Sequence, residues 1–184
     1  MSMYPIASYT VPSSTGAQIE FTNIPQNFTH LHIRYFVRNN SSGTSAYPNM
    51  YINGDGGSAH FVNHGLGGNG SSAFALYNVN NVFSPGATAP AAGSLSNVYA
   101  SYMIDILDYT NTNKLKVIKA IGGYDDNNTS GTNQGIYLLS GFNTTITGAV
   151  TQLDFSCYNP NGSTLTAGTR IDIYGITTSA ATGA

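Results

Sequence analysis

The chain has 184 residues, which is enough for one hydrophobic core of ordinary size. Only 8% of the residues are charged, and six lysines and arginines are too few to hold a nucleic-acid backbone. Glu20 is the only glutamate, so the chain lacks the charged residues that cover exposed helix faces, which excludes an all-α fold. We expect one domain over 1–178 and a flexible tail of small residues over 179–184.

The N-terminal segment, the lack of long apolar stretches and the single cysteine indicate where the protein is made and folds. Met1–Ser8 lacks the basic segment and apolar run of a signal peptide, and no stretch approaches the roughly 20 apolar residues of a membrane helix. We therefore expect synthesis and folding in a host cytoplasm, without a membrane partner. Cys157 excludes an intramolecular disulfide, and we expect it to be a small buried hydrophobic residue.

Apolar and polar residues alternate along the chain, and clusters of Gly, Asn, Pro and Ser separate the alternating segments. This pattern is typical of many strands with short connections. The predicted strands are Ile6–Val11, Ala17–Asn23, Thr29–Arg38, Met50–Asn53, Ala59–Asn63, Val98–Asp108, Lys114–Ile121, Gly135–Ser140, Ala149–Tyr158 and Thr169–Ile176. Because no helical pattern lies between them, the sequence favours an all-β fold, an antiparallel β-sandwich with a jelly-roll-like layout.

Turn sequences join several of these segments into predicted hairpins. Pro12–Gly16 would join the first two strands. Asn53–Gly57 would join the fourth and fifth, because an Asn-Gly or Asp-Gly pair between apolar runs is the strongest short-range hairpin signal. Tyr109–Asn113 would join the sixth and seventh into a long central hairpin. Gly65–Gly70 and Ser84–Ser96 show no period and are predicted to be loops.

The alternation also assigns side chains to the two faces of each strand. The residues predicted to face the core are Leu31, Ile33, Tyr35, Val37, Val98, Ala100, Tyr102, Ile104, Ile106, Leu153, Phe155, Cys157, Ile171 and Ile173. Gln152, Asp154 and Ser156 are predicted to face outward, and so are Asp105 and Asp172.

Two groups of residues are candidate metal ligands. His30 and His32 share one face of a strand, and His60 and His64 could come from a neighbouring segment to complete a transition-metal site. No carboxylate pattern accompanies them, and we expect surface or interface histidines without a metal. Asp125–Asn128 gathers oxygen ligands but lacks the spaced acidic residues of an EF-hand loop, so we expect a polar turn.

The sequence does not indicate a catalytic site. Glu20, Asp105, Asp108, Asp154 and Asp172 are scattered over different segments, whereas glycosidase chemistry needs two carboxylates across one bond. There is no Gly-x-Ser-x-Gly elbow and no glycine fingerprint for a nucleotide. We therefore expect no enzyme activity and no cofactor. A hydrolase that uses Glu20 or Asp105 is the remaining enzymatic alternative.

Tyrosine is the informative residue type, with 13 copies against no tryptophan. Its amphipathic ring is enriched in protein interfaces and can stack on sugars. The alternative is that these rings pack as cross-strand pairs on the outer faces of the sheets. Several tyrosines, Tyr77 among them, are predicted at strand exteriors or strand ends. The candidate interface residues are Tyr47, Tyr51, Tyr99, Tyr109, Tyr124 and Tyr158.

Several turn and strand signatures resemble those of structural proteins in the virions of tailed bacteriophages. They are Ile19–Gln26 followed by Thr29–Arg34, then Asp108–Lys114, Ser140–Phe142 and Tyr174–Ile176. The resemblance extends over nearly the whole chain, and none of its elements has catalytic content. In such phages, similar β domains occur as capsid decoration or cement proteins and as tail-fibre tips, commonly as trimers.

The resemblance implies a non-enzymatic structural protein of the virion. The first predicted strand follows Met1 within a few residues, which leaves no room for a fibre shaft. We therefore expect a homotrimeric capsid decoration protein that binds the major capsid protein and stabilises the outer shell through several modest contacts at once. The alternative is a tail-fibre or receptor-binding protein that recognises a glycan on the host cell surface.

Overall fold

The computed structural model describes residues 1–13, 18–55, 61–68, 72–80, 88–125, 135–143, 145–158 and 164–178. These residues form twelve strands: β1 (Ser2–Thr10), β2 (Ile19–Phe21), β3 (His30–Val37), β4 (Ser45–Ile52), β5 (Phe61–Gly68), β6 (Ala73–Asn80), β7 (Ala89–Pro90), β8 (Ala100–Leu107), β9 (Val117–Tyr124), β10 (Gly135–Asn143), β11 (Leu153–Tyr158) and β12 (Arg170–Thr177). Within this part of the chain no helix is long and apolar enough to cross a membrane.

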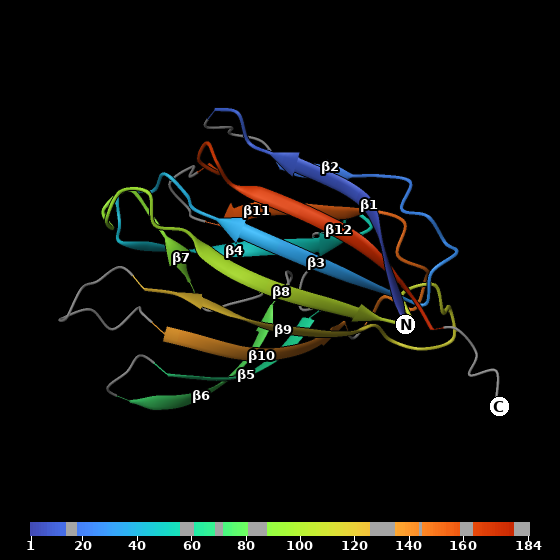
Figure 1. Ribbon diagram of the computed structural model, residues 1–184. Coiled ribbons are helices and arrows are strands. Elements are labelled where there is room, and N and C mark those ends of the chain that lie inside the picture. The colour runs from blue at the N-terminus through green and yellow to red at the C-terminus, as the bar shows by residue number, and fades with distance from the viewer. Residues whose placement is uncertain are drawn as a thin grey trace.

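The strands form two antiparallel sheets. The large sheet has eight strands in the order β1-β12-β3-β8-β9-β10-β5-β6, and the small sheet has four in the order β2-β11-β4-β7. Figure 1 shows the small sheet behind β12, β3 and β8, while β10, β5 and β6 extend beyond it at the bottom of the view. The predicted all-β sandwich is confirmed. The jelly-roll layout is not, because a jelly roll has eight strands in all.

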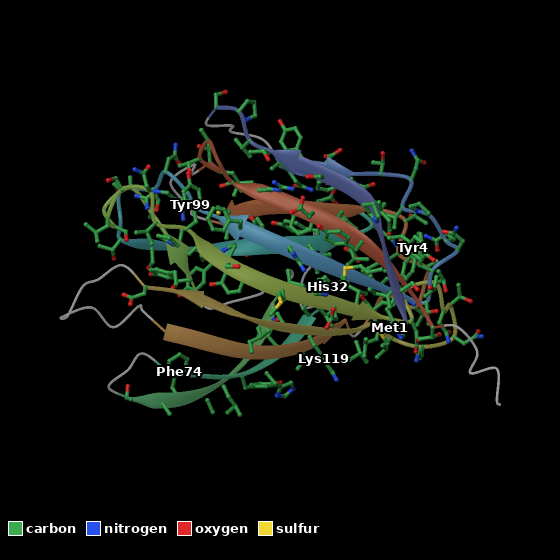
Figure 2. All side chains as sticks on the ribbon, in the orientation of Figure 1. Met1, Tyr4, His32, Phe74, Tyr99 and Lys119 are labelled. Atoms are coloured by element: carbon green, nitrogen blue, oxygen red, sulfur yellow. The ribbon has the colours of Figure 1, made fainter. Side chains whose placement is uncertain are left out.

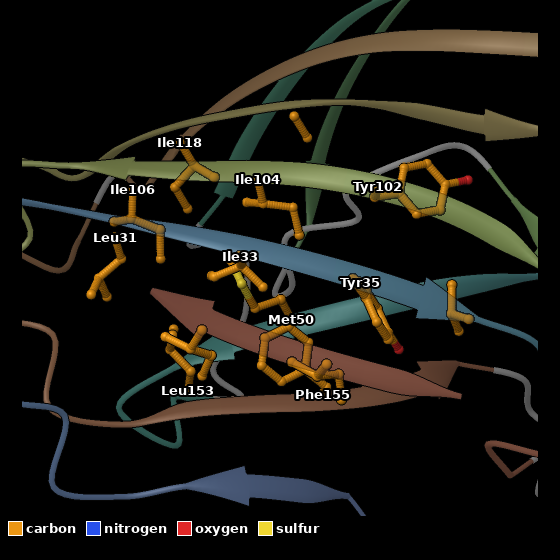
Figure 3. Packing of buried hydrophobic residues seen from close by; sticks show 14 of the residues in the cluster. Leu31, Ile33, Tyr35, Met50, Tyr102, Ile104, Ile106, Ile118, Leu153 and Phe155 are labelled. Atoms are coloured by element: carbon orange, nitrogen blue, oxygen red, sulfur yellow. The ribbon is translucent and has the colours of Figure 1, made fainter. Parts of the chain in front are cut away.

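One hydrophobic core lies between the two sheets. The predicted inward residues of β3 and β8 are almost completely buried, and they are Leu31, Ile33, Tyr35, Val37, Ala100, Tyr102, Ile104 and Ile106. Figure 3 shows Tyr35 of the large sheet beside Phe155 of the small sheet, and their ring centroids are 5.1 Å apart. Phe21 lies edge-on to Phe155 at 5.9 Å. The contact between the Tyr35 and Phe155 rings therefore joins the two sheets, and the Phe21 ring supports Phe155 from within the small sheet.

Two of the three predicted hairpins are wrong. Ile6–Val11 and Ala17–Asn23 do not pair with each other, because β1 pairs with β12 in the large sheet and β2 pairs with β11 in the small sheet. Met50–Asn53 and Ala59–Asn63 also belong to different sheets, since β4 pairs with β11 and β5 pairs with β10. In both places the connection crosses between the sheets. The central hairpin of β8 and β9 is confirmed.

The turn at Asn53–Gly54 has the expected backbone geometry although it closes no hairpin. The φ angles of its two residues are 56° and 67°, in the left-handed region that an Asn-Gly pair tolerates. The Asn53 Oδ1 atom accepts from the N–H groups of Thr151 (2.9 Å) and Gln152 (3.1 Å), and Nδ2 donates to the Ala149 carbonyl (2.9 Å). The turn therefore holds the segment that leads into β11.

Two regions predicted to be loops contain strands. Gly65–Gly68 forms the end of β5, where β10 and β6 pair with it on both sides. Glycine weakens a strand but does not exclude one that has neighbours on both sides. Ala73–Asn80, which forms β6, was not predicted as a strand, and the short β7 lies inside Ser84–Ser96. The tail 179–184 lies outside the described residues.

Candidate interaction surface

The outer face of the large sheet carries a polar row of side chains that crosses four strands. Tyr174, His32, Asp105 and Lys119 occupy matched positions on β12, β3, β8 and β9. Figure 2 locates His32 and Lys119 on this sheet. His32 Nδ1 lies 2.7 Å from Asp105 Oδ1, and the Arg34 guanidinium lies 5.7 Å from the centre of the Tyr174 ring. Within the polar row, His32 and Asp105 are therefore paired with each other.

An apolar row lies beside the polar row, displaced from it by two residues along each shared strand. We define it as Met103 on β8, Ile121 on β9 and Leu66 on β5. Met103 lies opposite Ile121, and the β10 residue opposite Ile121 lies opposite Leu66 in turn. The exposed fractions of the three side chains are 49%, 41% and 61%. Large apolar side chains grouped on one face, unlike scattered ones, indicate a protein-binding surface.

The histidines do not form the four-histidine site considered from the sequence. His30 Nδ1 accepts a hydrogen bond from the Asp108 N–H at 2.9 Å. His64 lies on β5, four strands away from His32 on β3. At about 4.8 Å per strand, these two residues are roughly 19 Å apart and cannot share a metal. His60 lies outside the described residues, as do 126–128 of the second candidate loop. Among residues that are described, no three His, Cys, Asp or Glu side chains gather as metal ligands.

The five scattered carboxylates separate onto the two sheets. Asp105, Asp108 and Asp172 lie on the large sheet or its border. Asp105 is hydrogen-bonded to His32, whereas Asp108 and Asp172 form ion pairs with Lys114 and Arg170. The hydrogen bond from the Lys114 ammonium is the main cause that lowers the pKa of Asp108. Glu20 on β2 lies opposite Asp154 on β11 in the small sheet. Glu20 and Asp105 therefore lie on different sheets, so they cannot act together on one bond as glycosidase chemistry requires.

Three of the candidate tyrosines are at the surface. Tyr47 on β4 is 53% exposed, and Tyr51 on the same face of that strand is half-buried. The half-buried Tyr99 donates its hydroxyl hydrogen to the Ala167 carbonyl at 2.7 Å, and its ring stacks on Phe36 at 4.6 Å. Tyr47 is therefore the most accessible of the three, whereas Tyr99 is held by contacts within the chain.

Two other candidate tyrosines belong to the core, which corrects the interface prediction for them. Tyr109 is completely buried, its hydroxyl donates to the Pro25 carbonyl, and burial raises its pKa. Asp108, with φ of 48°, interrupts the alternation of β8 just before Tyr109. Tyr124 is 7% exposed and shares the inward face of β9 with buried residues. The alternation along β9 could therefore have predicted that Tyr124 faces the core. The Tyr158 side chain lies outside the described part.

Cys157 packs against the core from β11 as a half-buried thiol. Burial raises the pKa of this thiol from the ordinary 9.0 to about 12. Because the thiolate is the reactive form, we expect Ellman's reagent to modify the native chain at least about 100-fold more slowly than the urea-unfolded chain at the same pH. Equal modification rates would contradict the burial of the thiol.

The raised pKa of the Cys157 thiol also predicts how the stability of the fold depends on pH. The thiol ionises above pH 9.0 in the unfolded chain but only near pH 12 in the folded chain. The unfolded state then binds fewer protons, so this stabilising contribution is complete below pH 9.0 and is lost as pH rises through this interval. A Cys157→Ala variant should show a weaker decline over the same interval in urea unfolding, which separates the thiol from the other ionisable groups.

Comparisons with known proteins do not place the chain in a family. No family model matches the sequence, and no curated protein or solved structure is similar to it. What the fold and its surface define is a class: an antiparallel β-sandwich whose large sheet exposes an apolar row beside a polar one.

Proposed function

We propose that this protein is a non-enzymatic structural protein that attaches to a larger assembly through the outer face of its large sheet. The apolar row is the observation that carries this proposal. Three large side chains, each at least 41% exposed, lie in one row there beside a polar row in which His32 and Asp105 are paired. A mixture of exposed apolar area and satisfied polar groups is common in specific protein interfaces.

For the assembly itself we propose the virion of a tailed bacteriophage, in which the chain is a capsid decoration protein that binds the major capsid protein. The support for the virion is the resemblance in the turn and strand signatures. A specific interface needs about 800 Å² on each partner, and eight strands at about 4.8 Å spacing give a sheet wide enough to supply it. A homotrimer would engage several shell subunits at once and bind more tightly.

Immunogold labelling of purified virions tests the location. Label over the head would support the decoration role, whereas label at the tail alone would contradict it.

Co-sedimentation with capsid shells assembled without this protein tests the docking face. The double variant Met103→Asp, Ile121→Asp should bind such shells at least about 100-fold more weakly, because two carboxylates would be buried without a partner. Tyr47→Asp, at an exposed position on the small sheet, is the matched control and should bind normally. If the Tyr47 variant loses binding while the double variant keeps it, the large sheet is not the docking face.

Glycan binding at a tail fibre is a second candidate function, favoured by one pair of rings. Tyr77 is 67% exposed, and its ring centre lies 5.2 Å from that of His64 on the neighbouring strand. An exposed aromatic ring of this kind can stack on a sugar. A glycan array that gives a signal with the wild-type protein but none with Tyr77→Ala would support this role, and no signal with either would contradict it.

A further inference from the structure

Two carboxylates lie directly opposite each other on the small sheet. Glu20 of β2 is the register partner of Asp154 of β11. Their neighbours Ile19, Leu153 and Phe155 are buried in the core, so both carboxylates are on the face that points away from it. Directly opposed side chains have Cβ atoms about 5 Å apart, and like charges at this spacing destabilise the strand pair.

Asp154 also has an oxygen that no hydrogen bond satisfies. The residue is completely buried although it faces away from the core, with Tyr51 of β4 opposite it on the other side from Glu20. Its Oδ1 atom accepts a hydrogen bond from Gln152 Nε2 at 2.8 Å, but its buried Oδ2 atom has no partner. A buried carboxylate oxygen without a donor or a cation is costly.

The chain provides no Lys or Arg side chain to neutralise this pair. All six of these residues lie on strands of the large sheet or on loops attached to it, and they are Arg34, Arg38, Lys114, Lys116, Lys119 and Arg170. The strands of the small sheet contain no basic residue. Of the remaining basic side chains, only His60 lies outside the described residues. Among the described residues, therefore, no basic side chain supplies the compensating charge.

We propose that Glu20, Gln152 and Asp154 bind a calcium ion on the outward face of the small sheet. Calcium takes six to eight oxygen ligands in a flexible geometry, and carboxylates, amide oxygens and waters all serve. Asp154 Oδ2 and the Glu20 carboxylate would provide the charge, and Gln152 Oε1 would provide a neutral oxygen. Magnesium fits less well, because it needs a near-ideal octahedron. With only two carboxylates, we expect weak binding, with Kd of about 10⁻⁴–10⁻³ M.

Calcium at this place would stabilise the attachment of a short edge strand of the small sheet. β2 has only three residues and lies at the edge of that sheet, where β11 is its single partner among the strands described. An ion shared by Glu20 and Asp154 would replace their repulsion by attraction and hold the two strands together. The site is independent of the apolar row, so the failure of either proposal leaves the other standing.

Thermal unfolding of the full chain, stripped with EDTA and then titrated with calcium or magnesium, tests the site. At calcium concentrations about 100 times Kd, the wild-type Tm should rise by about 5–10 °C, and magnesium should have a smaller effect. Glu20→Gln and Asp154→Asn should lose this response. Asp105→Asn, which removes a carboxylate from the large sheet, is the matched control and should keep it.

The Tm of the Asp154→Asn variant without metal shows whether Asp154 is a calcium ligand or a structural residue. If Asp154 is a ligand, Asp154→Asn should unfold at a Tm no lower than that of metal-free wild type, because the substitution removes the repulsion from Glu20. A wild type that does not respond to calcium would overturn the proposal. So would a full response in both Glu20→Gln and Asp154→Asn, or a loss of the response in Asp105→Asn. Calorimetric titration should give about one ion per chain.

Discussion

Replacing Gly122 by alanine should lower the free energy of unfolding by about 3 kcal/mol or more, the upper range for an overpacked interior site. Gly122 lies in β9, opposite Tyr102 of β8, where an added Cβ would come 2.2 Å from the Ser101 carbonyl oxygen and 2.3 Å from Tyr102 Cδ1. The carbonyl belongs to a strand in the middle of the large sheet, so it cannot move without disturbing the ladder. The Tyr102 ring is held by its hydroxyl, which donates to the Thr88 carbonyl.

The measurement for this site is urea unfolding followed by circular dichroism. Gly148→Ala is the matched control, because an added Cβ there meets no atom within 4 Å, and its effect should stay within about 0.5 kcal/mol. A Gly122→Ala protein as stable as the Gly148→Ala protein would show that the β8–β9 pair can shift to admit a methyl group.

The sequence predicts the positions and faces of strands well because alternation is a local property. Each inward residue of β3 is fixed by its immediate neighbours, and Leu31, Ile33, Tyr35 and Val37 are all buried. Partner choice is not local. β1 pairs with β12 from the other end of the chain, and no property of Pro12–Gly16 indicates that distant partner. The turn signals mark where the chain reverses but not the sheet that it enters next.

The candidate sites were also hard to predict, because they depend on contacts between segments that are distant in the sequence. The alternation places Met103, Ile121 and Asp154 on outward faces, yet the first two are exposed and Asp154 is completely buried. Whether an outward face is covered depends on the rest of the fold and cannot be read from one strand. The pairing of Glu20 with Asp154 was also hidden, because the predicted hairpin assigned the Glu20 strand to a different neighbour.

Replacing Arg38 should strongly lower the free energy of unfolding. It follows β3, is 8% exposed, and its guanidinium donates to four carbonyls and, within the described part of the chain, to no carboxylate. Nη1 donates to Leu95 (2.7 Å) and Val98 (2.9 Å), and Nη2 donates to Ala91 (2.7 Å) and Ser94 (3.2 Å). The planar fork of arginine suits such a set of acceptors. The loop after β7 is therefore folded around one side chain.

Arg38→Met should cost about 3–5 kcal/mol in urea unfolding, because four carbonyls, one in a buried and three in part-buried hydrogen bonds, lose their donor together. Arg38→Lys should recover only part of this loss, since one ammonium cannot reach acceptors spread over a fork. Arg34→Met, which removes an outward guanidinium from over the Tyr174 ring, is the matched control and should cost about 1 kcal/mol or less. If Arg38→Met costs no more than Arg34→Met, or if lysine restores full stability, the loop does not depend on the guanidinium. Faster amide exchange at Ala91–Val98 in the Arg38 variants would assign the loss to this loop.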